Sequence, residues 1–134
     1  FAHTRKHVAR AIMEGTAYGM RGMVEMMEGM GVKIGELRID GGGARSPLWR
    51  QIQADVVGKK VVVPQIAEST SVGAAILTSC GTGCYGAVEK AVDSMIKILE
   101  TREPKPENQK IYNEYHPKFM ERLLAGFAKV IAGE

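Results

Sequence analysis

The sequence predicts an α/β fold in which helices pack on a few parallel strands. Two short runs, at residues 36–40 and 61–64, have the length and composition of strands, and segments of helical periodicity precede, separate and follow them. Strands that alternate with helices of this length are typical of parallel sheets. Two strands are too few for a stable open sheet. We therefore expect further strands elsewhere in a longer chain, or a second copy that completes the sheet.

A long helix is predicted for residues 4–30, because apolar residues recur there at spacings of three, four and seven. They are Val8, Ile12, Met13, Met20, Met23, Met27 and Met30. Six of the eight methionines lie in this segment. We interpret them as core residues, since the flexible thioether fills irregular gaps, and an adaptable binding groove is the alternative. The stripe formed by Gly15, Gly19 and Gly22 predicts close approach of a neighbouring backbone.

The first strand runs directly into three glycines, at positions 41–43, and then into a helix start. Ser46 suits the N-cap of that helix and Pro47 its first position. We expect the helix to cover residues 47–57, because Gly58 follows the last apolar position.

The second strand, residues 61–63, is β-branched throughout and ends at Pro64. It is either buried on both faces or an edge strand ended by the proline. A helix then begins in the hydroxyl-rich segment 68–71, which offers capping side chains, and ends near Gly81.

Two further helices are predicted. Residues 86–99 have an amphipathic pattern, with Val88, Ala91, Val92, Met95, Ile96 and Leu99 facing inward. A charged, proline-containing connector is expected at 101–109. The last helix, residues 111–132, places Tyr112, Tyr115, Phe119, Leu123 and Phe127 on one side, and we expect it to bend or restart at Pro117.

Composition and charge exclude several classes of function. The 16 glycines in 134 residues show no Gly-X-Y period, which argues against collagen and disorder. The net charge of +3 arises within residues 1–10, so no basic face is predicted, and nucleic-acid binding is disfavoured. No run approaches 18 apolar residues and no signal segment opens the chain. We expect a soluble cytoplasmic protein that binds neither nucleic acid nor membrane.

The cysteines and histidines show no catalytic or metal-ligand spacing. Cys80 and Cys84 form a C-x3-C pair without a nearby histidine, and we interpret them as small buried thiols in a reducing compartment. His3 and His7 share a helix face but lack the glutamate of a His-Glu-x-x-His site, so no metal site is predicted.

The most informative segment is the strand, glycine turn and capped helix of residues 39–47. Such a turn presents bare backbone N–H groups and the positive end of a helix dipole at one point, which favours a phosphate or nucleotide. A tight strand-to-helix turn without a ligand is the alternative. Arg45 is a candidate for pairing with phosphate. Asp40 either contacts a magnesium water, acts as a base, or accepts amide hydrogens from its own loop.

Several stretches of this sequence resemble the C-terminal domain of the FGGY family of carbohydrate kinases, most closely its xylulokinase-like branch. The resemblance rests on residues 39–58 (IDGGGARSPLWRQIQADVVG), 68–77 (ESTSVGAAIL), 7–14 (HVARAIME) and 106–115 (PENQKIYNEY). Segment 7–14 is similar to the latter half of a family signature whose first half we expect upstream. Together these motifs cover nearly the whole chain.

The resemblance implies one part of an actin-like, ribonuclease-H-like ATPase lobe and the transfer of the ATP γ-phosphoryl group to a sugar or polyol. It implies ATP with Mg²⁺, nucleotide contacts from Gly42 and Gly43 with Gly41 adjoining, and a further contact from Ser46. The sugar-binding lobe, the aspartate base and the β- and γ-phosphate hairpin of the family have no counterpart here. We therefore expect no catalytic residue in this chain, no activity by itself, and several hundred further residues upstream in a parent enzyme.

These expectations divide the chain into residues 1–103, a nucleotide-binding portion, and residues 104–134, a C-terminal tail helix. The implied partners are ATP or ADP and a sugar held by the other lobe, and a homodimer is left open. One alternative is a non-catalytic assembly or regulatory module that self-associates through its methionine-rich and tail helices. Another is a different ATPase of the same superfamily, actin-like or chaperone-like.

Overall fold

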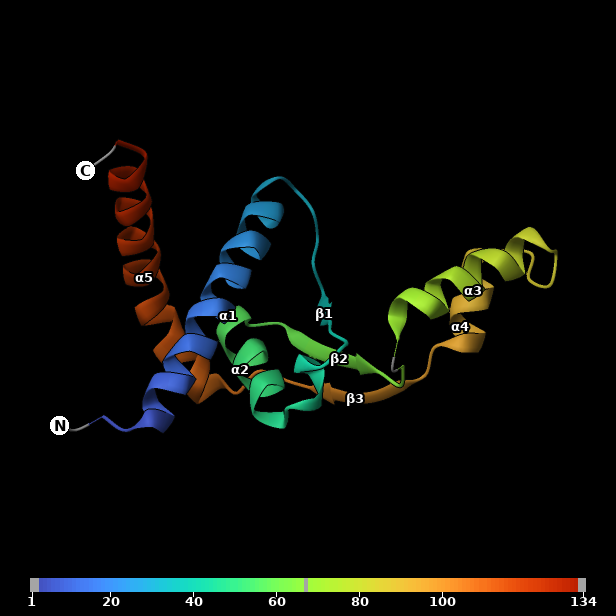
Figure 1. Ribbon diagram of the computed structural model, residues 1–134, viewed down its shortest axis with the longest axis horizontal. Coiled ribbons are helices and arrows are strands. Elements are labelled where there is room, and N and C mark those ends of the chain that lie inside the picture. The colour runs from blue at the N-terminus through green and yellow to red at the C-terminus, as the bar shows by residue number, and fades with distance from the viewer. Residues whose placement is uncertain (1–2, 67, 133–134) are drawn as a thin grey trace.

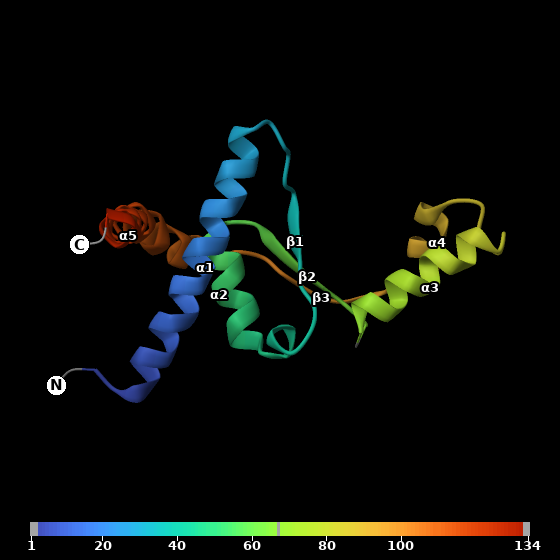
Figure 2. The same ribbon diagram turned by 45° about the horizontal axis from the view of Figure 1, so that its top comes forward.

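The computed structural model describes residues 3–66 and 68–132 and is shown in Figure 1. In chain order its elements are α1 (Arg5–Gly29), β1 (Glu36–Arg38), the short 3-10 helix η1 (Gly43–Arg45), α2 (Pro47–Val57), β2 (Lys60–Pro64), α3 (Ser69–Gly81), α4 (Val88–Met95), β3 (Ile98–Arg102) and α5 (Pro106–Ala132). The strands lie between α1, α2 and α5 at one end and the α3–α4 pair at the other (Figures 1 and 2). The predicted α/β class is confirmed.

The sheet has the strand order β1-β2-β3. β1 and β2 are parallel and are joined through α2, whereas β3 is antiparallel to β2. The prediction of parallel strands is therefore correct for the first pair only. Val61, Val62 and Val63 are each at most 5% exposed. Because successive strand side chains point to opposite faces, β2 is a central strand buried on both faces, and the edge-strand alternative is wrong.

The third strand was not expected, since its residues were assigned to the helix 86–99 and the connector that follows. The helix ends at Met95, and Ile98 and Leu99 lie in β3 with their side chains largely exposed. Of the residues predicted to face inward, Ala91 is fully buried, whereas Val88 and Met95 are exposed. Backbone pairing with β2 decides the conformation here, and apolar spacing alone cannot distinguish the two structures over so short a run.

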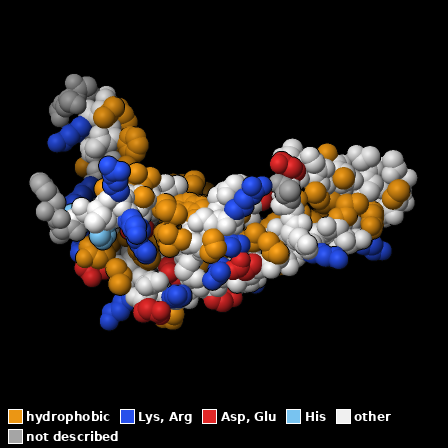
Figure 3. Space-filling view, turned by 60° about the horizontal axis from the view of Figure 1, so that its bottom comes forward, with side chains coloured by type: hydrophobic (Ala, Val, Ile, Leu, Met, Phe, Trp, Pro, Cys, Tyr) orange, Lys and Arg blue, Asp and Glu red, His pale blue; other side chains and the backbone are white. Residues whose placement is uncertain are grey.

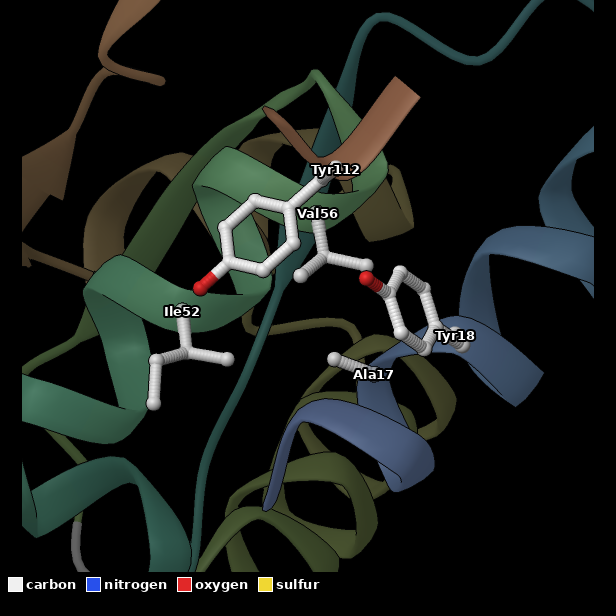
Figure 4. Packing of buried hydrophobic residues seen from close by; sticks show 5 residues of the cluster. All are labelled: Ala17, Tyr18, Ile52, Val56 and Tyr112. Atoms are coloured by element: carbon white, nitrogen blue, oxygen red, sulfur yellow. The ribbon is translucent and has the colours of Figure 1, made fainter. Parts of the chain in front are cut away.

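The largest cluster of buried residues lies where α1, α2 and α5 meet (Figure 4). It consists of Ala17, Tyr18, Ile52, Val56 and Tyr112, with Met13, Trp49 and Phe119 packed against it. A second cluster under α2 joins Ala44 and Ala54 to Val61 and Val63 of β2. α2 therefore connects the helical end of the molecule to the sheet.

Helix α1 confirms the predicted span to within a residue at each end, but its packing differs from expectation. Met23, Met26, Met27 and Met30 are exposed, so the interpretation of the methionines as core residues is wrong for these four. Two glycines of the stripe face side chains instead of a backbone, and a Cβ on Gly19 would meet nothing within 4 Å. A Cβ on Gly22 would lie 3.1 Å from the methyl carbon of Met120, and Gly15 faces Phe119.

Helix α5 begins at Pro106, five residues before the predicted start, and continues through Pro117 without a restart. Its start is held by the buried carboxylate of Asp55, which accepts a hydrogen bond from the Lys105 amide at 2.7 Å. Tyr112 is buried as expected, but Tyr115, Leu123 and Phe127 are exposed. Figure 3 shows hydrophobic side chains on the projecting end of this helix and over the α3–α4 pair.

The ends of α2 and α3 and the burial of the two cysteines can also be compared with expectation. Helix α2 has the predicted bounds, and Gly58 follows it in the left-handed conformation, with φ 71°. Helix α3 begins at Ser69 as predicted, but Glu68 is its N-cap and no side chain caps it. Cys84 is exposed and Cys80 is half-buried, so the expectation of two buried thiols is wrong. Among the described residues, no helix is long and apolar enough to cross a membrane.

Candidate functional site

The candidate site lies at the carboxyl ends of the two parallel strands. Residues 40–43 follow β1, and residues 65–66 follow β2, one strand along the sheet. Because parallel strands end at the same edge, the two connections lie together there. In open α/β sheets this edge is where ligands bind.

The three glycines of the turn have different conformations. Gly41 has φ 72°, a left-handed conformation that side chains other than glycine adopt at a cost. Gly42 has φ −60° and ψ −39°, which any residue tolerates, and a Cβ there would meet nothing within 4 Å. A Cβ on Gly43 would lie 3.2 Å from the indole nitrogen of Trp49. The backbone therefore needs glycine at 41, the packing of Trp49 favours it at 43, and neither reason applies at 42.

Ser46 caps helix α2 as predicted. Its hydroxyl oxygen accepts a hydrogen bond from the Trp49 amide at 3.3 Å, and Pro47 occupies the first helical position. Through its backbone N–H groups, the start of this 11-residue helix contributes a partial positive charge beside the glycine turn. Gly41, Gly42, Gly43 and Ser46 are thus brought together in one exposed turn.

A cavity of about 590 Å³ lies against this turn. It is lined by Asp40, Gly41, Ala44, Arg45, Arg50, Val63, Pro64, Gln65, Ile66 and Leu99. Its volume is within the range typical of small-molecule sites, about 300–1,000 Å³. Arg45 is the cation of this lining that is available to an anion, because Arg50 is paired with Glu100.

Arg50 is the most deeply buried charge of this lining. Its side chain is 10% exposed, and its Nη1 contacts Glu100 Oε2 of β3 at 2.6 Å. Glu100 also contacts Arg102. The Arg50 Nε is buried and has no hydrogen-bond partner among the described residues. The Arg50–Glu100 ion pair links α2 to β3 and places the Arg50 guanidinium in the wall of the cavity.

A second cavity, of about 280 Å³, lies on the α3 side of the same connections. It shares Asp40, Pro64 and Ile66 with the first, and its lining also contains Arg38, Ser69 and the aliphatic side chains of Ile39, Val72, Ile76 and Ile96, with Gly73 beside them. The two cavities are therefore adjacent and mainly apolar, and the larger one differs by containing Arg45 and Arg50.

The sequence predicted the turn but missed most of this lining. Asp40 and Arg45 were identified as candidates and line the cavity, whereas Arg50, Gln65 and Leu99 were not. Arg50 lies one helical turn after the Ser46 N-cap, a spacing that brings it back toward the turn, so a signal existed for this residue. Leu99 had none, because its segment was assigned to a helix. Within the described ranges, no group of three or more His, Cys, Asp or Glu side chains is placed to hold a metal ion.

Comparisons with known proteins identify the family of this chain. Residues 2–82 match the model of the C-terminal domain of the FGGY family of carbohydrate kinases. A xylulose kinase of Staphylococcus epidermidis is 35% identical over 114 residues, which are 85% of this chain and 23% of that protein. A glycerol kinase of Saccharolobus islandicus is 36% identical over an alignment of 135 positions, covering 98% of this chain and 26% of that protein.

Solved structures also resemble this chain over about a quarter of their own length. The xylulose kinase of Rhodospirillum rubrum superimposes with a TM-score of 0.82 at 27% identity, over 97% of this chain and 26% of that one. The fold is thus a portion of the actin-like, ribonuclease-H-like ATPase fold of these kinases. The chain spans about a quarter of the length of the relatives that it matches. It belongs to the FGGY family of carbohydrate kinases and corresponds to part of their C-terminal domain.

Proposed function

We propose that this chain supplies the adenine-nucleotide half-site of an ATP-dependent sugar or polyol kinase and is inactive by itself. The observation that carries the proposal is the open space over Gly42, which adjoins a cavity lined by Gly41 and Arg45 without lining it itself. Neither the backbone conformation nor the packing requires glycine at this position. A ligand that approaches the backbone closely would account for a residue without a side chain at this position.

The two cavities suit the two halves of a nucleotide. The Arg45 guanidinium in the lining of the larger cavity favours phosphate oxygens, and so do the start of α2 and the amides of Gly42 and Gly43, which adjoin that cavity without lining it. The apolar cavity beside α3 favours a flat base, and Gly73 keeps its wall free of a side chain. Gly41 sets the direction of the turn, and Ser46 holds the start of α2 through its cap.

Mg²⁺ would accompany ATP and offset charge on its phosphates. Magnesium retains several waters and is held by one or two carboxylates together with substrate phosphates. Asp40 is exposed and is the single carboxylate in the lining of the larger cavity as described, so we assign it to a water-mediated contact with the ion. Catalytic residues and the sugar site belong to the rest of the parent enzyme in this proposal, with residues 1–103 as the nucleotide portion and residues 104–134 as the tail.

Gly42 offers a clean test of the nucleotide site. Gly42→Ala and Gly42→Leu are compatible with its φ and with the space around it, so the fold should be retained while the side chain occupies the ligand volume. Calorimetric titration with ATP should show weaker binding for the alanine variant and none for the leucine variant. Gly19→Ala, on α1 with nothing within 4 Å, is the matched control. Unchanged affinity of Gly42→Leu contradicts the proposal.

The activity is tested with the full-length parent. ATP turnover should depend on an added pentulose, hexulose or polyol, and D-xylulose is the substrate that we place first, because the motifs are most similar to the xylulokinase-like branch. A parent whose ATP turnover depends on none of these acceptors is not a sugar kinase. We also expect the parent to be cytoplasmic, which fractionation of the source cells would test.

The exposed methionines of α1 and the exposed apolar residues of α5 favour a second candidate, a module that associates through these helices. Light scattering of the isolated chain separates the two. A tight symmetric dimer that is indifferent to nucleotide supports assembly, whereas a monomer that binds ATP supports the half-site.

A further inference from the structure

A separate cavity lies between α1 and α5, lined by other residues than the glycine turn and its two cavities. It has a volume of about 560 Å³, and its lining includes the rings of Tyr18, Tyr112, Tyr115 and Phe119 and the cations Lys118 and Arg122. Aromatic rings form much of the lining, and two of them, on Tyr18 and Tyr112, belong to the main hydrophobic cluster shown in Figure 4. One wall is therefore fixed by the core.

The polar groups at the base of this cavity satisfy one another. The Tyr112 hydroxyl donates to Glu14 Oε1 at 2.7 Å and accepts from Arg10 Nη2 at 3.1 Å, while Arg10 Nε contacts the same carboxylate oxygen at 2.7 Å. Tyr112 is 5% exposed, and burial with the Glu14 hydrogen bond raises its pKa to about 12, so it remains a donor. Arg10 and Glu14 neutralise each other and leave no charge for a ligand.

Lys118 and Arg122 then determine the charge that the cavity offers. Both are exposed and lie one turn apart on α5. Lys118 pairs with Glu114 at 2.9 Å, but both side chains are more than half exposed, and such surface pairs exchange easily. No ion pair involves Arg122 among residues 3–66 and 68–132. Arg122, and Lys118 once it leaves Glu114, are thus the cations beside the aromatic wall, and Lys118 Nζ lies 5.1 Å from the centroid of the Tyr115 ring.

We propose that the cavity between α1 and α5 is a second ligand site, for a small organic anion with a flat apolar body. The body lies against Tyr18, Tyr115 and Phe119, and the phosphate or carboxylate group lies between Lys118 and Arg122. The volume and the mixture of apolar wall and few polar groups are those of small-molecule sites. The charge complementarity selects an anion, because the single carboxylate in the lining is already paired with Arg10.

Trp49 is a built-in reporter for this site. It packs against the cluster that contains Tyr18 and Tyr112, which also line the cavity. It is the single tryptophan of the chain, so its fluorescence has one source. The same indole lies against Gly43, and nucleotide must therefore be absent from the titration.

The experiment is a fluorescence and calorimetric titration of the 134-residue chain with phenyl phosphate and with benzoate. Inorganic phosphate and benzyl alcohol are the fragments that carry only the charge or only the ring. The double variant Lys118→Gln/Arg122→Gln and the variant Tyr115→Ser alter the two halves of the site at exposed positions. Lys129→Gln removes one positive charge on the same helix outside the lining.

Phenyl phosphate or benzoate should bind the parent chain at least about tenfold more tightly than either fragment, since both halves of the site contribute. The double variant should lose at least about tenfold in affinity, because charge-assisted hydrogen bonds are the strong ones, and Lys129→Gln should lose none. Tighter binding of phenyl phosphate or of benzoate shows whether the site prefers a phosphate or a carboxylate group.

Three results would overturn the proposal. The first is phenyl phosphate and benzoate binding no tighter than inorganic phosphate. The second is equal loss of affinity in the double variant and in Lys129→Gln. The third is a dimer in sedimentation velocity that dissociates in Tyr115→Ser, because the cavity would then be a contact between copies. A urea midpoint close to that of the parent chain would show that each variant is folded.

Discussion

Replacing Asp55 should remove the attachment of α5 to α2. The carboxylate is 2% exposed and accepts three hydrogen bonds, from Gln51 Nε2 at 2.8 Å, the Lys105 amide at 2.7 Å and Asn108 Nδ2 at 2.7 Å. Loss of the contact at the helix start costs about 1 kcal/mol as a lost cap. The two amide hydrogen bonds add about 0.5–1.5 kcal/mol each. Asp55→Ala should therefore lower the free energy of unfolding by about 2–4 kcal/mol.

The assay is urea unfolding followed by Trp49 fluorescence and circular dichroism. With a slope of about 2 kcal/mol per molar urea, the midpoint should fall by about 1–2 M. Asp55→Asn keeps one acceptor oxygen and should lose about half as much. Asp93→Ala makes the same chemical change at an exposed position of α4 and should stay within about 0.5 kcal/mol of the parent chain. If Asp55→Ala and Asp93→Ala have the same urea midpoint, the Asp55 carboxylate does not hold α5, and the reasoning is refuted.

Three further predictions concern backbone and protonation. Gly58→Ala should cost about 1–2 kcal/mol in the urea assay because φ is 71°, and the end of the Gln109 side chain must also move away from the new Cβ. Gly19→Ala should instead stabilise α1 by up to about 1 kcal/mol, and equal effects of the two substitutions would exclude a conformational cause. Burial lowers the pKa of His116 below its usual 6.5, against the opposing influence of Glu25 at 3.7 Å. The unfolded state then binds more protons than the folded state, so the free energy of unfolding should fall as pH drops below about 6.5, until the folded-state pKa is passed. The fall should be less steep in His116→Gln, and identical slopes in the variant and the parent chain would contradict this. Absorbance titration should reveal one tyrosine with a pKa of about 12 that is missing from Tyr112→Phe, since burial and the Glu14 hydrogen bond raise that pKa.

Local chemistry made part of the fold predictable. Helix α2 has its predicted bounds because Ser46, Pro47 and Gly58 act within one turn of the helix ends that they define. The strand–glycine–helix turn was predicted for the same reason. These signals depend on neighbours in sequence, and no distant contact overrides them.

Long-range contacts account for what the sequence did not predict. β3 is a strand because β2 offers a free edge, and the spacing of Val92, Met95 and Leu99 fits a helix equally well. The methionines of α1 have helical spacing, but only contacts with other elements decide whether their face is covered. Arg50 and Leu99 reach the candidate cavity from α2 and β3, and their convergence requires the folded sheet.

The central claim is that the glycine turn at the end of β1 binds an adenine nucleotide. Its most direct test is a titration of the ¹⁵N-labelled chain with ADP, followed by amide chemical shifts. The account predicts that the largest shifts occur at Gly41, Gly42, Gly43 and Ser46, with smaller ones at Gly73 beside the apolar cavity, and that Gly42→Leu abolishes them. Saturable shifts confined to Tyr115, Lys118 and Arg122, or no saturable shifts at all, would contradict it.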